Sequence, residues 1–207
     1  MVQAQRLLGI GSYKTVWLMA HKIRSAMSHR DKRYKLAGLI ELDEAFFGTR
    51  TIAKRKSKTE QAAFVAVGTN EEGRPTFSRM QISERLLYED AQVLADTFFD
   101  KGRAAVKTDG KILYRYSLKK AGFDHTQRVL DAPQKVEAFL PWVHILISNV
   151  KRFLQGTHHR ESPKHLQRFL DEFTYRFNRR WWQGQLFDRL LTACTTAPSV
   201  TFAELSE

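Results

Sequence analysis

Three carboxylates interrupt an apolar stretch in the first quarter of the chain, LAGLIELDEAFFG (36–48). They are Glu41, Asp43 and Glu44, and the residues around them predict a buried strand over 36–47. A strand interior excludes an isolated carboxylate, because burying the charge is costly unless it is paired or binds a metal. The stretch therefore indicates a carboxylate whose charge is compensated by another group or by a cation.

A second carboxylate ends another apolar segment. Asp109 directly follows AAVKT (104–108), which predicts a short strand, and Gly110 comes next. Because α/β proteins present ligands at the ends of their strands, Asp43 and Asp109 could share a divalent cation if the two strands are neighbours. Pairs of such cations roughly 4 Å apart catalyse in-line phosphoryl displacement. Asp before Gly is also an ordinary turn, and that alternative stays open here.

A third candidate lies in LPWVHILISNVKRFLQGTHH (140–159), which predicts a helix beginning near Pro141. One row of this helix is apolar and consists of Val143, Ile147, Val150 and Leu154. A polar row beside it contains His144 and Lys151, which therefore project in one direction, two turns apart. A lone histidine is more often a core residue than a ligand. A histidine and a lysine that follow two strand-end aspartates favour a functional site.

The charge balance indicates the partner. The 207 residues include 34 Lys and Arg against 22 Asp and Glu, which gives a formal net charge of +12 and a pI near 10. With 43% apolar residues the chain can bury a core, so it belongs to the globular class. An excess of this size favours a polyanion such as nucleic acid over a merely solvated basic surface.

Cysteine usage and hydropathy indicate the compartment. Cys194 is the one cysteine, so neither an internal disulfide nor a cysteine zinc site is available. We find no signal-peptide core at the start, MVQAQRLLGIGSYK, and no run of about 18 apolar residues that a membrane span needs. We expect a soluble cytoplasmic protein associated with the nucleoid.

The remaining pattern predicts a sheet followed by helices. A turn and a helix capped by Ser12 are expected over 7–27. That helix suits the second half of a helix-turn-helix, or equally a packing helix with solvated lysines. Further strands are expected at 62–68 and 76–83, a helix at 86–99, and helix throughout 136–182. Strands first, then helices, predict a mixed sheet flanked by helices.

Taken together, the motifs resemble a known family. IELDEAFFG, VKTDG, LPWVHILISNVKRFLQGTHH and HLQRFLDEFTYRFNRR are similar to bacterial insertion-sequence transposases of the DDE superfamily. The similarity is to the ISXO-like branch, with His in the third catalytic position, and spans Leu7 to Leu205. The resemblance implies an α/β, RNase H-like domain with a mixed five-stranded sheet. It also implies a DNA transposase that uses two divalent cations, Mg²⁺ or Mn²⁺.

The same resemblance implies roles for individual residues. Asp43, Asp109 and His144 match the metal ligands, with Asp43 bridging both cations and the other two holding one each. Lys151 matches the basic residue that contacts donor DNA near the cleavage site. Glu41 and Glu44 would then serve structure or support the metal ligands from behind. Glu137 and Glu172 are alternative third ligands, although a structural ion pair suits Glu172 better.

Basic residues elsewhere are candidates for DNA contact, and individually each is also compatible with a solvated surface. The candidates are Lys14, Arg24, Lys54, Arg55, Lys56, Lys151, Arg152, Arg179 and Arg180. YRFNRRWW (175–182) interleaves arginines with aromatic residues, which suits stacking on unpaired bases. His158, His159 and His165 lack a further ligand at suitable spacing, so we expect them at the surface.

The expected organisation has three parts: a partial helix-turn-helix at 1–30, the catalytic domain at 36–182 and a C-terminal tail at 183–207. Relatives generally carry a longer N-terminal region, so we expect this chain to be N-terminally truncated. The expected partners are the element's terminal inverted repeats, target DNA and a second copy in a homodimer. Two rival functions stay open, a nuclease of the same fold and an inactive DNA-binding remnant.

Overall fold

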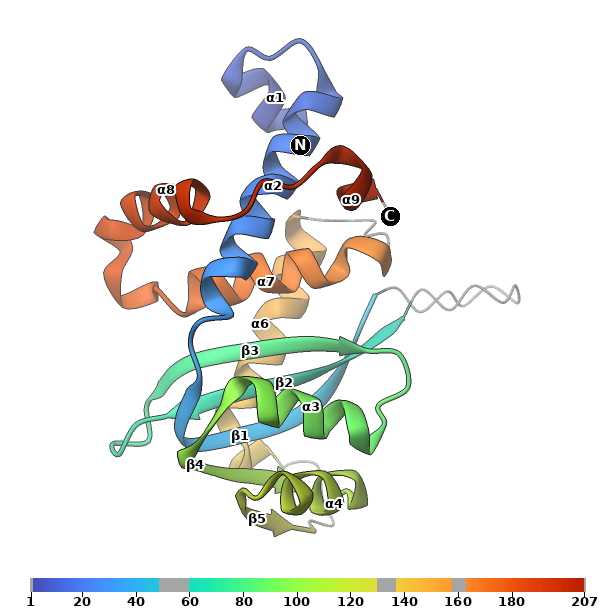
Figure 1. Ribbon diagram of the computed structural model, residues 1–207, viewed down its shortest axis with the longest axis vertical. Coiled ribbons are helices and arrows are strands. Elements are labelled where there is room, and N and C mark those ends of the chain that lie inside the picture. The colour runs from blue at the N-terminus through green and yellow to red at the C-terminus, as the bar shows by residue number, and fades with distance from the viewer. Residues whose placement is uncertain (1, 49–59, 130–136, 158–162, 207) are drawn as a thin grey trace, which may run out of the picture.

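The computed structural model of the chain describes residues 2–48, 60–129, 137–157 and 163–206. Within these ranges, strands form one mixed sheet in the order β3-β2-β1-β4-β5 (Figure 1). Their bounds are β1 Leu36–Phe47, β2 Gln61–Thr69, β3 Pro75–Ser83, β4 Phe99–Asp109 and β5 Asp124–Arg128. β2 runs antiparallel to β1 and β3, whereas β4 is parallel to β1 and β5 is parallel to β4. This confirms the expected mixed five-stranded sheet.

Helices cover both faces of the sheet because its central strands are apolar on both sides. The covering helices are α3 (Tyr88–Phe98), α4 (Ile112–Ala121), α6 (Pro141–Thr157) and α7 (Leu166–Phe177). Leu42 of β1 is fully buried in the cluster formed with α3 and α4, whereas Val65 of β2 is fully buried in the cluster formed with α6 and α7. Side chains alternate along a strand, so each strand contributes to both cores.

The two ends of the chain pack together beside α7. α2 (Tyr13–Asp31) crosses α7 and lies against α8 (Leu186–Thr196), and Met27, Tyr175 and Ala193 form a small buried cluster at this meeting point (Figure 1). α1 (Val2–Leu8) precedes α2, and α9 (Phe202–Ser206) approaches it through Phe202. The three-part domain division stays a prediction.

Several predicted elements are confirmed. Ser12 caps α2 by accepting a hydrogen bond from the Thr15 N–H at 3.3 Å. The strand at 36–47, the hairpin strands and the helix after them all form. The expectation of helix throughout 136–182 needs correction: α6 ends at Thr157, and Trp182 has non-helical backbone angles inside the 3₁₀ segment Arg180–Gln185.

Residue patterns alone missed α4 and β5. β5 is the edge strand DHTQR, which has no apolar run, and its residues alternate between exposed and half-buried. α4 begins without a side-chain cap and ends at Gly122, whose left-handed φ of 78° suits glycine. No helix among the described residues has both the length and the apolar character to cross a membrane.

Candidate active site

The alternation of β1 explains its three carboxylates. Glu41 and Asp43 point toward the α6 side of the sheet, and Glu44 points toward α4, as the opposite alternation of Leu42 and Ala45 between the two cores requires. Glu41 and Asp43 are 3% and 6% exposed, so both carboxylates sit in the protein interior. Each of the three makes a different compensating contact.

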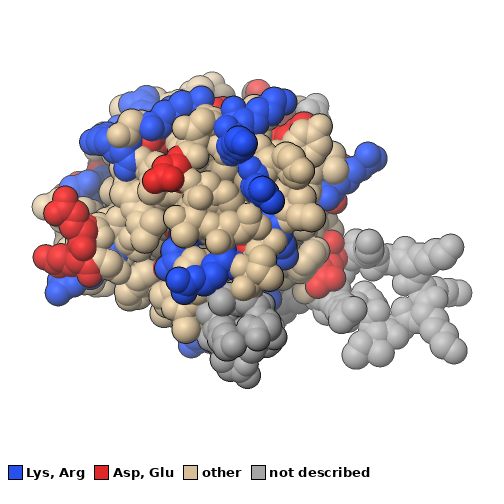
Figure 2. All heavy atoms as spheres, turned by 90° about the horizontal axis from the view of Figure 1, so that it is seen from below, with Lys and Arg blue, Asp and Glu red and all other residues tan. Residues whose placement is uncertain are grey.

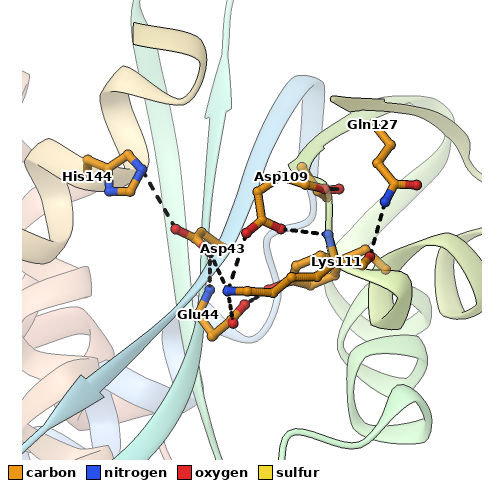
Figure 3. A network of polar contacts seen from close by, with 8 residues as sticks. Asp43, Glu44, Asp109, Lys111, Gln127 and His144 are labelled. Atoms are coloured by element: carbon orange, nitrogen blue, oxygen red, sulfur yellow. Dashed lines mark hydrogen bonds and ion pairs between the residues drawn. The ribbon is translucent and has the colours of Figure 1, made fainter. Parts of the chain in front are cut away.

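Asp43 and Asp109 come together because their strands are parallel neighbours. The β1–β4 ladder ends with Leu42 opposite Thr108, so the two aspartates follow at the same level. The ammonium of Lys111 lies between them, 3.7 Å from Asp43 Oδ1 and 3.3 Å from Asp109 Oδ2 (Figure 3). A lysine thus bridges the two carboxylates that the sequence pairs.

The turn after β4 holds Lys111 in this position. A Cβ on Gly110 would lie 2.8 Å from the Val129 Cα, so only glycine lets the chain pass the end of β5 so closely. The Lys111 N–H donates to Asp109 Oδ1 at 3.2 Å, and the Gln127 amide donates to the Lys111 carbonyl at 3.3 Å. Asp109 is therefore a turn residue and a site residue at once.

His144 approaches Asp43 from the opposite side. Its Nε2 lies 3.8 Å from Asp43 Oδ2, which is too long for a hydrogen bond, and this buried nitrogen has no hydrogen-bond partner (Figure 3). Burial lowers the pKa of His144, with Lys111 acting in the same direction and Glu137 and Asp109 opposing it. The imidazole is therefore neutral near pH 7, with a lone pair available on one nitrogen.

Glu41 fixes the start of α6 and so positions His144. Its Oε2 accepts the backbone N–H groups of Trp142 and Val143 at 2.8 and 3.0 Å. These groups belong to the first turn, which has no partners within the helix and carries the positive end of the helix dipole. Burial raises the pKa of Glu41, while these hydrogen bonds and Lys107 oppose that rise.

Glu44 joins the site from the other face of β1. Its carboxylate accepts a hydrogen bond of 2.5 Å from the Tyr114 hydroxyl and forms a close ion pair with Lys111. Burial works against the charged Lys111 ammonium, but the contact with Glu44 and the charges of Asp43 and Asp109 raise its pKa. Sequence reasoning missed Lys111 and Tyr114, although their positions two and five residues after Asp109 follow the strand-end turn.

The pKa of Asp43 reflects the charged groups that lie close around it. Burial is the main reason that its pKa rises to about 7, and the charges of Glu44 and Asp109 also raise it. Lys111 and the Glu44 N–H, which donates to Asp43 Oδ1 at 2.9 Å, lower it. Lys111 therefore offsets only part of the effects that raise the pKa of Asp43.

The residues of the site are of types that bind a divalent cation, but their present placement does not hold one. Among the described residues no three His, Cys, Asp or Glu side chains stand where they could hold a metal ion together. The space between Asp43 and Asp109 is taken by the Lys111 ammonium. Two carboxylates and an unpartnered imidazole nitrogen are nevertheless chemically suitable ligands for Mg²⁺ or Mn²⁺.

The other predicted ligands lie apart from this centre. Glu172 forms a buried ion pair of 2.7 Å with Arg24, so the structural role expected for it is confirmed. Glu137 is exposed, although its charge acts on His144. His165 packs edge-on against Trp17 and is half-buried rather than exposed, which corrects the expected surface position. His158 and His159 lie outside the described residues.

The predicted DNA-binding residues divide into three groups. Those exposed on described helices are Lys14, Lys151 and Arg152, and those outside the described residues are Lys54, Arg55 and Lys56. Arg24 and Arg179 need correction, because both are buried and are paired with Glu172 and Asp31, each at 2.7 Å. Arg180 donates to the backbone carbonyls of Thr76, Pro75 and Phe177, so its guanidinium already has partners.

Comparison with protein families gives a match over residues 35–178 to the ISXO2-like transposase domain. The matched segment covers β1 to the end of α7, and so includes every residue of the site described above. The chain belongs to the ISXO2-like transposase family. Comparison of this transposase-family chain with curated proteins gives no match.

Solved structures similar to this ISXO2-like chain include two viral proteins. A chain of the simian T-cell lymphotropic virus intasome, solved in complex with PP2A regulatory subunit B56 gamma, is 15% identical with a TM-score of 0.48. That match covers 81% of this chain and 57% of the viral one, so this chain spans little more than half of its length. The catalytic core domain of BIV integrase is 14% identical with a TM-score of 0.44. That match covers 77% of this chain and 97% of the integrase domain.

Proposed function

We propose that the chain is a DNA transposase that cleaves phosphodiesters at the ends of a mobile element and joins the freed 3′-hydroxyl to target DNA. One observation carries the proposal: Asp43 of β1 and Asp109 of β4 share the Lys111 ammonium, and the unpartnered Nε2 of His144 on α6 lies 3.8 Å from Asp43 Oδ2. In the first step water attacks phosphorus and the 3′-oxygen leaves. In the second that 3′-hydroxyl attacks a target phosphorus and displaces another 3′-oxygen.

The site would hold two divalent cations, with Asp43 contacting both and Asp109 and His144 contacting one each. Such cations activate the attacking oxygen and stabilise the leaving oxygen. Because imidazole suits softer ions than Mg²⁺, activity with Mn²⁺ is at least as high as with Mg²⁺. Lys111 would move aside when the carboxylates take up these cations, and its ammonium is half-exposed and able to turn toward a DNA phosphate.

The protein surface supplies further DNA contacts. Lys151 lies two turns beyond His144 on α6 and is exposed, which suits a contact with a phosphate next to the cleaved bond. Figure 2 shows several groups of Lys and Arg atoms, and fewer groups of Asp and Glu atoms, on the end of the molecule that carries α4 and β5. We infer that the DNA partners are terminal inverted repeats and target DNA, bound by a homodimer.

The test is cleavage and joining of labelled DNA that carries the element's own ends, with Mn²⁺ and with Mg²⁺. Wild type is compared with Asp109→Ala and His144→Ala. The matched controls are Asp124→Ala, at the start of β5, and Ser148→Ala, one turn beyond His144 and exposed. We expect both product types from wild type and controls, and a loss of at least about a hundredfold in both site variants.

Two other results would replace the proposal by a rival. Cleaved ends without joined products, at every metal and target concentration, would indicate a nuclease of the same fold. DNA binding without any cleavage by wild type would indicate an inactive DNA-binding remnant.

A further inference from the structure

A polar cavity lies away from the candidate site and is lined mainly by residues from the C-terminal half of α2, from β3 and from the first turns of α7. Its volume is about 270 Å³, which is ample for a tetrahedral oxyanion. The polar and charged side chains that line it include Ser25, Ser28, Lys32, Arg79, Lys164 and Arg168. No predicted DNA-binding residue is among them.

Positive charge predominates in this cavity. Lys32, Arg79, Lys164 and Arg168 face one carboxylate, Asp171. Asp171 is already engaged at 2.9 Å by the Gln167 amide, which also donates to the Met80 carbonyl. The pKa of Arg168 is lowered by burial and by the nearby charge of Arg24, as expected where cations lie close together. The charge of Asp31 also acts on Arg79, but the cations that line the cavity still outnumber the nearby acids, which favours a bound anion.

Arg79 is the most deeply buried of the four cations that line the cavity. It is 5% exposed, its guanidinium lies 4.3 Å from the centre of the Phe98 ring, and it donates to the backbone carbonyls of Asp31 and Tyr34. Its Nε–H is buried and has no hydrogen-bond partner. An unsatisfied donor on a buried cation is costly, and a ligand oxygen that reached it would remove that cost.

We propose that this cavity binds a phosphate group. A phosphate offers several acceptor oxygens to a cavity lined by cations from several elements, which a single carboxylate cannot match as well. Met80, which lines the cavity, pairs with Val65, and Val65 pairs with Asp43. The cavity therefore lies at the level of Asp43 along the strands, two strand spacings or roughly 10 Å across the sheet. The proposal rests on the proposed function only for naming the DNA backbone as the source of the phosphate.

The Arg79 Nε–H resonance, assigned by triple-resonance NMR, reports on this site directly. The wild-type protein is titrated with inorganic phosphate, and separately with a duplex oligonucleotide, at constant ionic strength set with chloride. The double variant Lys32→Ala/Lys164→Ala removes two exposed lining charges and leaves Arg79 in place. Lys119→Ala/Lys120→Ala on α4 is the control, because it removes two exposed lysines elsewhere.

We expect saturable shifts of the Arg79 Nε–H with inorganic phosphate, weakened at least about fivefold in the Lys32/Lys164 variant and unchanged in the control. A matching shift with duplex DNA assigns the phosphate to the DNA backbone, whereas a shift with phosphate alone assigns it to a free anion. The proposal is overturned if neither ligand shifts the Arg79 Nε–H resonance. It is also overturned if the Lys32/Lys164 variant and the Lys119/Lys120 control bind phosphate with equal affinity. The cleavage assay is independent of this result, so failure here leaves the transposase proposal intact.

Discussion

Asp43 is the residue where the requirements of folding and of chemistry conflict. Its carboxylate is buried beside Glu44 and Asp109, and its pKa rises to about 7. In the metal-free protein it therefore lowers the stability of the fold once it ionises, and a bound cation would remove that cost. This unfavourable charge supports the proposal that a cation binds at Asp43.

Replacing Asp43 by Asn tests this directly. The folded-state pKa lies above the ordinary value of 3.8, so the folded protein binds more protons and loses stability as the pH rises from about 4 to 7. Asn removes the charge, so the metal-free variant is expected to be more stable than wild type by at least about 1 kcal/mol at pH 8, and not at pH 4. Urea unfolding in the presence of a chelator measures it. The account is contradicted if the stability of Asp43→Asn relative to wild type falls between pH 4 and pH 8.

At the residue scale, the sequence predicted those polar site residues that interrupt or follow a periodic pattern. Asp43 breaks an apolar strand, and His144 shares a helical row with Lys151, so both could be recognised. Lys111 and Tyr114 could not, because their contacts with Glu44 depend on how α4 leaves the end of β4. The burial of Arg24 was equally hidden, since its partner Glu172 lies 148 residues away.

At the scale of elements, α6 is anchored by one carboxylate from β1. Glu41 accepts both N–H groups at the beginning of the helix, and Trp142 Nε1 donates to the Gly73 carbonyl at 2.7 Å. The apolar row of α6 predicted which face is buried, and Val143 and Val150 are indeed fully buried. The position of α6 along its own axis depends on these contacts with segments distant in the sequence. The spacing of apolar residues carries no information about them.

Glu41→Ala and Glu41→Gln form a graded pair. Ala leaves two N–H groups without their acceptor, and we expect a loss of about 2–3 kcal/mol in the free energy of unfolding. Gln keeps an acceptor oxygen but loses the charge next to the helix dipole, so its loss should be about 1 kcal/mol. Urea unfolding at pH 7 measures both.

The same variants should also affect catalysis through His144. With Gln, DNA binding stays at the wild-type level while cleavage falls, because the helix start is slightly displaced. Equal stability of wild type and Glu41→Ala would contradict the anchoring role.

At the scale of the whole molecule, charge is segregated. The chain has a formal net charge of +12, yet four carboxylates, those of Glu41, Asp43, Glu44 and Asp109, gather in one region. The basic composition predicted a nucleic-acid partner. It could not distinguish a lysine at the surface from an arginine buried in an ion pair, such as Arg179 with Asp31.

Binding of duplex DNA should therefore depend steeply on salt. Each phosphate neutralised by Lys or Arg releases counterions, so affinity is expected to fall at least about a hundredfold between 50 and 200 mM salt. Fluorescence anisotropy with a labelled duplex provides the measurement. Affinity that changes less than threefold over this range would show that phosphate contacts do not dominate binding.

The most direct test of the central claim, that Asp43 of β1, Asp109 of β4 and His144 of α6 together hold divalent cations, is Mn²⁺ binding to the metal-free protein. Electron paramagnetic resonance titrations at pH 8, where Asp43 is ionised, compare wild type with Asp109→Ala, His144→Ala and the control Ser148→Ala. The account predicts affinity lowered at least about tenfold in both site variants and unchanged in the control. Wild-type affinity in His144→Ala would contradict it.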